Sequence, residues 1–262
     1  MKKMTFNKRD FMLRASFFIF VIAIWHFTVK MFDISSLVFP APAGVIAALY
    51  KGIVSGEYLL HTGVTLYETL MGFAIGAIIA LILGGLIGQI RILEKILYPY
   101  IVAFQAMPKV AIAPLFVAWF GFGVTSKIII TATIVFFPIL ANTIVGLRSA
   151  PREQIEMMTA FTASPWQMFQ MVRFPHALPY IFAGLDIGIV LAIIGAIVGE
   201  FVGAQAGLGY LILQRNFSMD ITGVFAILIV LSAIGIGLHT IMKIIAKRTI
   251  YWSETSEDLR QQ

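Results

Sequence analysis

The sequence predicts an all-α integral membrane protein with six transmembrane helices. Hydrophobic residues make up 60% of its 262 residues and charged residues only 12%, well below the roughly 25% of a soluble domain. The 22 glycines and ten prolines favour close-packed, interrupted helices, because small residues let helix backbones approach one another in a membrane. The alternating segments of about ten residues that build a membrane β-barrel are not found in the sequence.

Six hydrophobic runs each approach the roughly 20 residues with which a helix crosses a bilayer. We place them at residues 12–32, 66–88, 97–120, 126–147, 178–203 and 222–246. The first run follows a basic stretch, but the APA sequence at 41–43 lies too far beyond it to be a signal-peptide cleavage site. We therefore expect an uncleaved first helix and a single membrane domain over residues 1–262.

Basic residues orient the predicted spans, because cytoplasmic loops of membrane proteins collect Lys and Arg. Most of these side chains fall on one side of the spans, and four fall on the other: Lys30, Lys51, Lys127 and Arg215. Both termini and the stretch between the fourth and fifth spans are therefore expected in the cytoplasm. The net charge of +6 follows from this topology rather than from nucleic-acid binding. On the outer side, an apolar periodic segment after Pro42 predicts a short helix along the membrane surface.

Two of the spans carry a small residue at every fourth position. These ridges are Gly72, Gly76, Ala80, Gly84 and Gly88 in the second span, and Gly184, Gly188, Ala192 and Ala196 in the fifth. Such ridges let another helix backbone lie close. We expect them to serve packing within the chain, with a subunit interface or a moving seam as the alternatives.

The stretch between the fourth and fifth spans has the signature of two short helices. In REQIEMMTAF, three large apolar side chains lie near one face and two carboxylates on another: Met157, Met158 and Phe161, and Glu153 and Glu156. A second helix begins with Ser164 as N-cap, Pro165 at the first helical position and Gln167 three residues after the cap. We expect this helix to end before Pro175. Exposed Met and Phe side chains favour docking on another protein, although contact with lipid headgroups or with the chain's own helix ends would also cover them.

Several sequence motifs resemble those of one family of transport proteins. Glu156, Thr162, Val172 and Pro175 fall at the spacing of the EAA motif found in the permeases of bacterial ABC importers. The further matching words are MPKVAIAPLFVAWFGFG (107–123), FFPILANTIVGL (136–147), LPYIFAGL (178–185) and GEFVGAQAGLGYLI (199–212). From Phe39 to Trp252 the chain resembles the branch of this family that takes up nitrate, sulfonates, taurine and thiamine precursors.

This resemblance implies a type I ABC-importer permease fold in the bacterial inner membrane. It implies three kinds of partner: a second copy of the chain, ATP-binding cassette ATPase subunits, and an external binding protein that delivers a small anionic or polar organic solute. ATP and Mg would be bound by the partner ATPase, so the chain itself is expected to carry no cofactor and to be no enzyme. In agreement, its sequence contains no nucleotide-binding loop.

The resemblance implies that residues 149–177 form a cytoplasmic loop that docks on the ATPase, and we call them the coupling segment. The contact residues that the resemblance implies are Glu153, Glu156, Met157, Met158, Phe161, Thr162 and Ser164. Here methionines replace both alanines of the motif, and Thr162 replaces its glycine. Because a β-branched residue disfavours positive φ, we expect the helix break at Thr162 to differ from a left-handed glycine break.

Charged residues inside the spans are candidates for the translocation path. Lys109 lies between Pro108 and Pro114, which disturb helix hydrogen bonding. An ammonium inside a membrane needs water or a carboxylate, and Glu200 is a possible partner. We expect Lys109 to favour an anionic solute, with a structural Lys–Glu pair or a position at the cytoplasmic interface as alternatives.

The remaining polar residues in or beside the spans point to no further site. Glu68, His61 and Asp186 fit headgroup-level positions better than ligand sites. The four histidines have no metal-ligand spacing and the chain has no cysteine, so we predict no metal site.

Two other classes of function stay open beside the ATP-driven importer. A secondary carrier driven by an ion gradient would need inverted repeats and several intramembrane carboxylates, for which Glu200 alone is a fair candidate. A membrane enzyme would need a nucleophile and base at one depth, and the sequence suggests none. The sequence does not select the solute.

Overall fold

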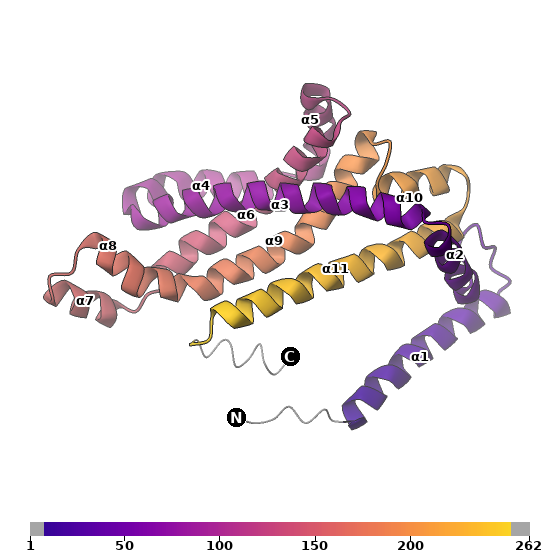
Figure 1. Cartoon of the computed structure of the whole chain (residues 1–262), viewed down its shortest axis with the longest axis horizontal. Helices are drawn as coiled ribbons and strands as arrows, with labels where there is room; N and C mark the ends of the chain where they lie inside the picture. Colours follow the sequence, from indigo (N-terminus) through magenta and orange to yellow (C-terminus); the bar gives the residue numbers. More distant parts are fainter. Residues whose placement is uncertain (1–7, 253–262) are drawn as a thin grey trace. The chain divides into compact units, whose positions relative to one another are not determined.

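The computed structural model describes residues 8–252, and the regular structure of these residues is entirely helical (Figure 1). Within this described range, four helices are long and apolar enough to cross a membrane. They are α3 (Glu57–Gln89), α6 (Val124–Arg148), the continuous helix Pro165–Gly203 that contains α9 (Phe174–Gly203), and α11 (Ile221–Thr249). The all-helical membrane fold predicted from the sequence is thereby confirmed.

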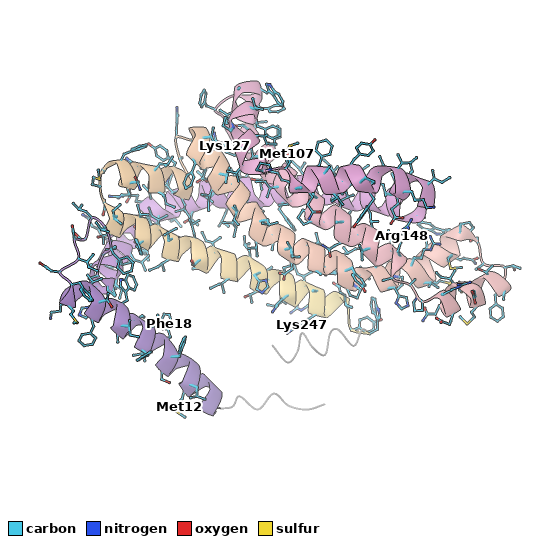
Figure 2. The ribbon with its side chains drawn as sticks, turned by 180° about the vertical axis from the view of Figure 1, so that it is seen from behind. Met12, Phe18, Met107, Lys127, Arg148 and Lys247 are labelled. Atoms are coloured by element: carbon cyan, nitrogen blue, oxygen red, sulfur yellow. The ribbon has the colours of Figure 1, made fainter. Side chains whose placement is uncertain are left out.

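The third predicted span is not one helix. It is divided into α4 (Arg91–Ala106), the short 3₁₀ helix η1 (Lys109–Ile112) and α5 (Ala113–Phe120), with a bend of 78° between the two halves. Met107 marks this bend in Figure 2. The bend follows from Pro108 and Pro114, because a proline removes a backbone donor and its ring collides with the preceding turn.

The number of spans predicted from the sequence stays a prediction. The bent pair of α4 and α5 passes the length and composition test as a fifth span. In α1 (Lys8–Met31) the apolar part runs only from Ala15 to Met31, which is shorter than the four long spans. The short helix expected after Pro42 is present as α2 (Pro42–Val54), and its place along the membrane surface stays a prediction.

By its internal contacts the chain divides into two compact units, and each is described by itself. The first unit comprises Met1–Leu60 and Leu211–Leu231. An aromatic cluster of Trp25, Phe39 and Phe225 packs in it, with ring centroids 5.5 to 6.0 Å apart. The indole N–H of Trp25 donates to the carbonyl of Pro40 (3.1 Å), so the polar atom of this partly buried ring is also satisfied.

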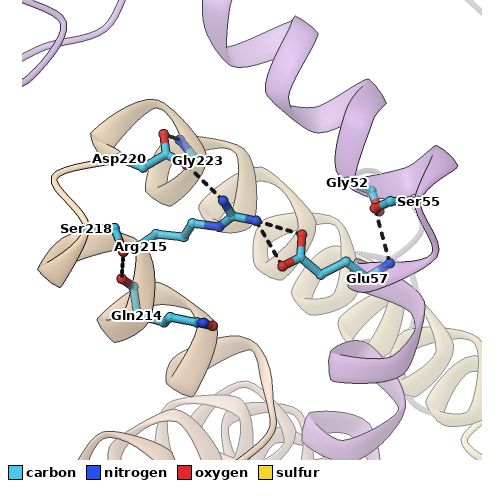
Figure 3. Close-up of polar contacts among 8 residues, drawn as sticks. All are labelled: Gly52, Ser55, Glu57, Gln214, Arg215, Ser218, Asp220 and Gly223. Atoms are coloured by element: carbon cyan, nitrogen blue, oxygen red, sulfur yellow. Dashed lines mark hydrogen bonds and ion pairs between the residues drawn. The ribbon is translucent and has the colours of Figure 1, made fainter.

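Arg215 ties together three helix ends in the same unit (Figure 3). It lies in α10 (Leu208–Phe217) and donates to both carboxylate oxygens of Glu57 at 2.7 and 2.9 Å, at the start of α3. It also donates to Asp220 at 3.2 Å, whose other oxygen accepts the N–H of Gly223 in the first turn of α11 (2.9 Å). The guanidinium suits this arrangement because its two terminal nitrogens bind different carboxylates, Nη2 that of Glu57 and Nη1 that of Asp220.

The second unit, His61–Tyr210 with Ser232–Gln262, is organised around α6. A side chain added at Gly72 or Gly76 of α3 would collide with α6, at Thr131 and at the backbone of Ala132. A side chain added at Gly184 or Gly188 of α9 would collide with α6 as well, at Asn142 and Ile139. Both small-residue ridges therefore serve packing within the chain, as expected, and both pack against α6.

The apolar core of this unit follows the same contacts. Its buried residues come from α3, α4, α6 and α9: Ala77, Ala80, Ile87, Ile101, Val135, Ile139, Leu140, Ile144 and Ala192. Arg148, at the end of α6 (labelled in Figure 2), forms an ion pair with Glu94 of α4. This core thus holds α6 over the stretch from Val135 to Ile144.

We predict that Gly76→Val destabilises the fold, because the added side chain would meet the backbone of Ala132 at 2.6 Å from its Cβ. Overpacking of this kind costs about 1–3 kcal/mol. Thermal unfolding of the detergent-solubilised protein measures it. Gly85→Val is the matched control, since Gly85 lies on the same helix and nothing within 4 Å meets its added Cβ. Equal melting temperatures for the two variants would contradict close packing of α3 on α6.

Candidate functional site

A cluster of buried polar side chains lies within the second unit. Thr65 and Glu68 of α3, Lys127 of α6 and Glu200 of α9 each have 1–2% of their surface exposed. They come from the three helices that the glycine ridges bring together. Charged groups this deeply buried require partners, because desolvation strongly disfavours an isolated charge.

Glu200 and two residues of α3 accept hydrogen bonds from the backbone N–H groups at the start of α10. The backbone N–H groups of Gly207, Leu208 and Gly209 donate to His61 Nδ1 (3.0 Å), Thr65 Oγ1 (2.8 Å) and Glu200 Oε2 (2.5 Å), respectively. Thr65 also donates its hydroxyl proton to Glu200 Oε1 (2.6 Å). The first N–H groups of a helix have no partner within the helix, and a carboxylate is favoured there by the helix dipole. Side chains distant in sequence thus cap α10.

Lys127 binds carbonyl groups at the C-terminal end of a helix. Its ammonium donates to the carbonyls of Phe122, Gly123 (3.0 Å) and Gly203 (2.7 Å), so all three N–H donors are used. Gly203 is the last residue of α9, where unpaired carbonyls and the helix dipole favour a cation. The outer-side position expected for Lys127 stays a prediction, and its side chain is buried among helices.

Glu68 completes the cluster without being fully satisfied. Its side chain is buried, with 2% of its surface exposed, and its Oε2 has no hydrogen-bond partner. The headgroup-level depth expected for Glu68 stays a prediction, but the side chain is enclosed by the protein rather than exposed to headgroups.

The structure does not bring Lys109 and Glu200 together. Lys109 donates to the carbonyl of Gln105 (3.0 Å) and lies 5.1 Å from the ring centre of Phe137. The partners of Glu200 are those of the buried cluster instead. Asp186, expected at the headgroup level, accepts a hydrogen bond from His239 of α11 at 2.6 Å.

The coupling segment presents apolar side chains to its surroundings. It contains α7 (Arg152–Ala160) and α8 (Pro165–Met168). Phe161 is 77% exposed and Met157 53% exposed, while Met158 is half-buried and the remaining predicted contact residues, Glu153, Glu156, Thr162 and Ser164, are exposed. Glu156 forms an ion pair with Arg152 one turn earlier on α7 (2.7 Å). The predicted capping box is confirmed, since Ser164 and Gln167 bond each other's backbone N–H.

The helix break at Thr162 is left-handed, which corrects the geometry expected from its β-branched side chain. Its φ is +54°. The N–H of Thr162 donates to Thr159 and that of Ala163 to Met158, both at 3.0 Å, which is the bond pattern of a Schellman helix end. These two bonds, with the capping box directly after them, hold a threonine where such an end usually has glycine.

The expected helix end before Pro175 is also wrong. Residues Phe169–Arg173 form a π-helical turn, η2, that joins α8 to α9, so that one helix runs from Pro165 to Gly203. In this turn the N–H of Phe174 donates to the carbonyl of Phe169, five residues earlier. The wider turn displaces the carbonyls with which a proline ring would collide, and the helix can therefore continue through Pro175.

Comparison with known proteins identifies the family. Residues 72–251 match the family described as "Binding-protein-dependent transport system inner membrane component". The chain belongs to this family. This permease is therefore the membrane component of an ABC importer and not a catalytic enzyme. In such a transporter, ATP is handled by a partner ATPase.

Individual relatives agree with this assignment. The permease is 40% identical to the riboflavin transport system permease protein of Chloroflexus aurantiacus, over 88% of this chain and 87% of the relative. It is 34% identical to the formylaminopyrimidine transport permease protein of Halalkalibacterium halodurans, over 87% and 91% of the two chains. A chain of the inward-facing MetNI methionine ABC transporter has the same fold, with a TM-score of 0.63 at 21% identity, over 72% of this chain and 94% of that one.

We predict that Thr65→Val destabilises the permease, because it removes the acceptor of the Leu208 N–H and a donor to Glu200. Leaving buried polar groups unpaired costs about 1–3 kcal/mol each. The melting temperature in detergent reports the loss. Thr240→Val is the control, since the Thr240 hydroxyl is exposed and bonds only the preceding turn of its own helix. A Thr65→Val protein as stable as the control would show that the cap of α10 contributes nothing.

We predict that Thr162→Gly stabilises the permease by about 1 kcal/mol, because glycine adopts positive φ without the collision that a Cβ causes. Thermal unfolding again measures this change. Ala163→Gly is the matched control: its φ is not positive, so glycine there only adds freedom to the unfolded chain and lowers stability. If Thr162→Gly behaved like the control, the left-handed conformation at Thr162 would be refuted.

Proposed function

We propose that the permease acts as a homodimer in the bacterial inner membrane, with both termini in the cytosol, and imports a small anionic or polar organic solute. An external binding protein delivers the solute, and an ATPase bound at each coupling segment drives alternating access of a central path. The observation that carries this proposal is the exposed apolar surface of the coupling segment, on a helix pair with firmly capped ends.

The chemistry of α7 favours a protein partner over the lipid surface. Helices that lie on membranes carry Lys and Arg on their polar face and are attracted to anionic headgroups. In contrast, α7 has Glu153 and Glu156 against the single basic residue Arg152. An acidic helix with an exposed Phe161 at its end suits a protein groove that offers apolar contacts and basic side chains.

The coupling segment is mechanically continuous with the membrane helices. It joins the end of α6 to the start of α9, and these two helices lie against each other at Gly184, Gly188 and Gly195. The helix from Pro165 to Gly203 has 39 residues, which gives a length of about 58 Å. Its far end carries the carbonyl of Gly203 that Lys127 binds. A displacement at α8 would therefore reach the buried polar cluster without passing through a flexible loop.

Roles in the translocation path follow for the two charged residues singled out from the sequence. Lys109, half-buried at the bend between α4 and α5, would present positive charge to the solute. Glu200 would act as a positioning residue that holds the start of α10. The relatives named for riboflavin and formylaminopyrimidine transport support a small polar solute, and the binding protein would make the finer selection.

We predict that Phe161→Asp and Met157→Asp each abolish co-purification of the ATPase with the tagged permease, or weaken it at least tenfold. Exposed apolar side chains at the centre of an interface commonly contribute this much, since truncating an interface hot spot costs about 2 kcal/mol or more. Because both side chains are exposed, the substitutions leave the permease folded. Phe217→Asp is the control, as Phe217 is 82% exposed at the end of α10.

ATP turnover of the same preparations separates this proposal from its main rival. Turnover should appear only with the ATPase bound and fall with its loss in the Phe161→Asp variant. An ion-gradient-driven carrier would instead transport without any ATPase, and unchanged binding and turnover in both coupling-segment variants would reject the docking surface.

A further inference from the structure

The end of α4 is left uncovered by the rest of the chain. Every residue from Val102 to Pro108 is exposed, although this stretch lies inside the sequence of a predicted span. It leads into the 78° bend to α5, at Met107 (Figure 2). Interrupted membrane helices of this kind commonly border solute sites, because the interruption frees backbone groups and opens space.

Two aromatic rings and one ammonium group meet at this bend. Phe104 of α4 stacks on Phe137 of α6, with centroids 6.1 Å apart and ring planes 16° from parallel. Lys109 Nζ lies 5.1 Å from the centre of the Phe137 ring. Phe104 is 52% exposed, so part of its ring remains open to contact from outside the chain. The three side chains come from α4, η1 and α6, all in the second unit.

The ammonium of Lys109 keeps unused donors. It gives one hydrogen bond to the carbonyl of Gln105, whereas an ammonium has three donors. Among the ion pairs of the described residues 8–252, none involves Lys109. Since α4 rises about 24 Å over its 16 residues, the lysine lies far from the cytoplasmic end of that helix. A charged group at this depth faces water or an anion rather than lipid.

We propose that Phe104, Phe137 and Lys109 form a binding site for a planar aromatic anion on the translocation path of the permease. The solute's ring stacks on Phe104, and its carboxylate, sulfonate or phosphate pairs with the Lys109 ammonium. This inference rests on the proposed function, and it narrows the solute from a small polar molecule to a ring that carries negative charge. Val102, Met107 and Val110, close by in the sequence, are also exposed.

Saturation-transfer NMR of the permease with its ATPase in lipid nanodiscs tests the site, because it detects weak ligands. The probes are benzoate and cyclohexanecarboxylate, which have the same charge and similar size but differ in ring character. Benzoate should bind about three- to tenfold more tightly, in line with the strength of aromatic pairs. Lys109→Gln should weaken both probes, whereas Phe104→Leu should remove only the preference for benzoate. The controls are Lys30→Gln and Phe27→Leu, which change an exposed lysine and an exposed phenylalanine of α1.

Three results would overturn the site. Equal binding of the two probes, unchanged benzoate binding in Lys109→Gln, or loss of the dimer in Lys109→Gln would each do so, the last by assigning the lysine to a subunit contact. Co-purification and ATP turnover, measured on the same samples, separate this outcome from failure of the proposed function. If the permease binds its ATPase and supports ATP turnover but binds both probes equally, only the aromatic-anion site is refuted. If the permease never binds an ATPase, the proposed function itself is refuted.

Discussion

The close approach of α6 to both α3 and α9 is the constraint on which the rest of the structure depends. Glycines on these two helices leave no room for side chains at the crossing points, so α6 has only one position against them. That position sets Lys127 beside the end of α9 and Phe137 beside the end of α4. The coupling segment follows directly on the end of this helix.

Buried charges in this protein complete helix ends. Lys127 binds carbonyls at the end of α9, and Glu200 accepts an N–H at the start of α10. Each charge thus has the sign that the corresponding end of a helix favours. The short connection between α9 and α10 is held from both sides, which explains why ionised groups are tolerated among apolar helices. Lys109 differs from both, because it binds a single carbonyl and stays half-buried.

Local patterns in the sequence predicted much of this structure. The ridge that contains Gly72 and Gly76 predicted close packing, and Ser164 with Gln167 predicted a capping box, because in both cases the partner residues follow a fixed spacing along one helix. The buried cluster could not be found in this way. Thr65, Lys127 and Glu200 are separated by more than sixty residues each, and only the fold brings them together. The helix α10 was missed for the same reason, since its caps come from α3 and α9.

Errors at the coupling segment came from applying local preferences without their context. Threonine disfavours positive φ, but two backbone bonds and a capping box impose it at Thr162. Proline disfavours a continuous helix, but a π turn before Pro175 accommodates the ring. At both positions the surrounding hydrogen bonds outweighed the preference of a single residue.

The π turn also determines how α7 and α8 are oriented about the axis of α9. Such a turn holds one residue more than an α-helical path of the same rise. Each residue of an α-helix advances the side-chain direction by about 100°. Deletion of a single residue between Phe169 and Arg173 would therefore allow a regular α-helix there. It would also rotate α7 and α8 about the axis of α9. The chain length of this turn is thus a geometric parameter of the transporter, and natural variation here should substitute residues far more readily than insert or delete them.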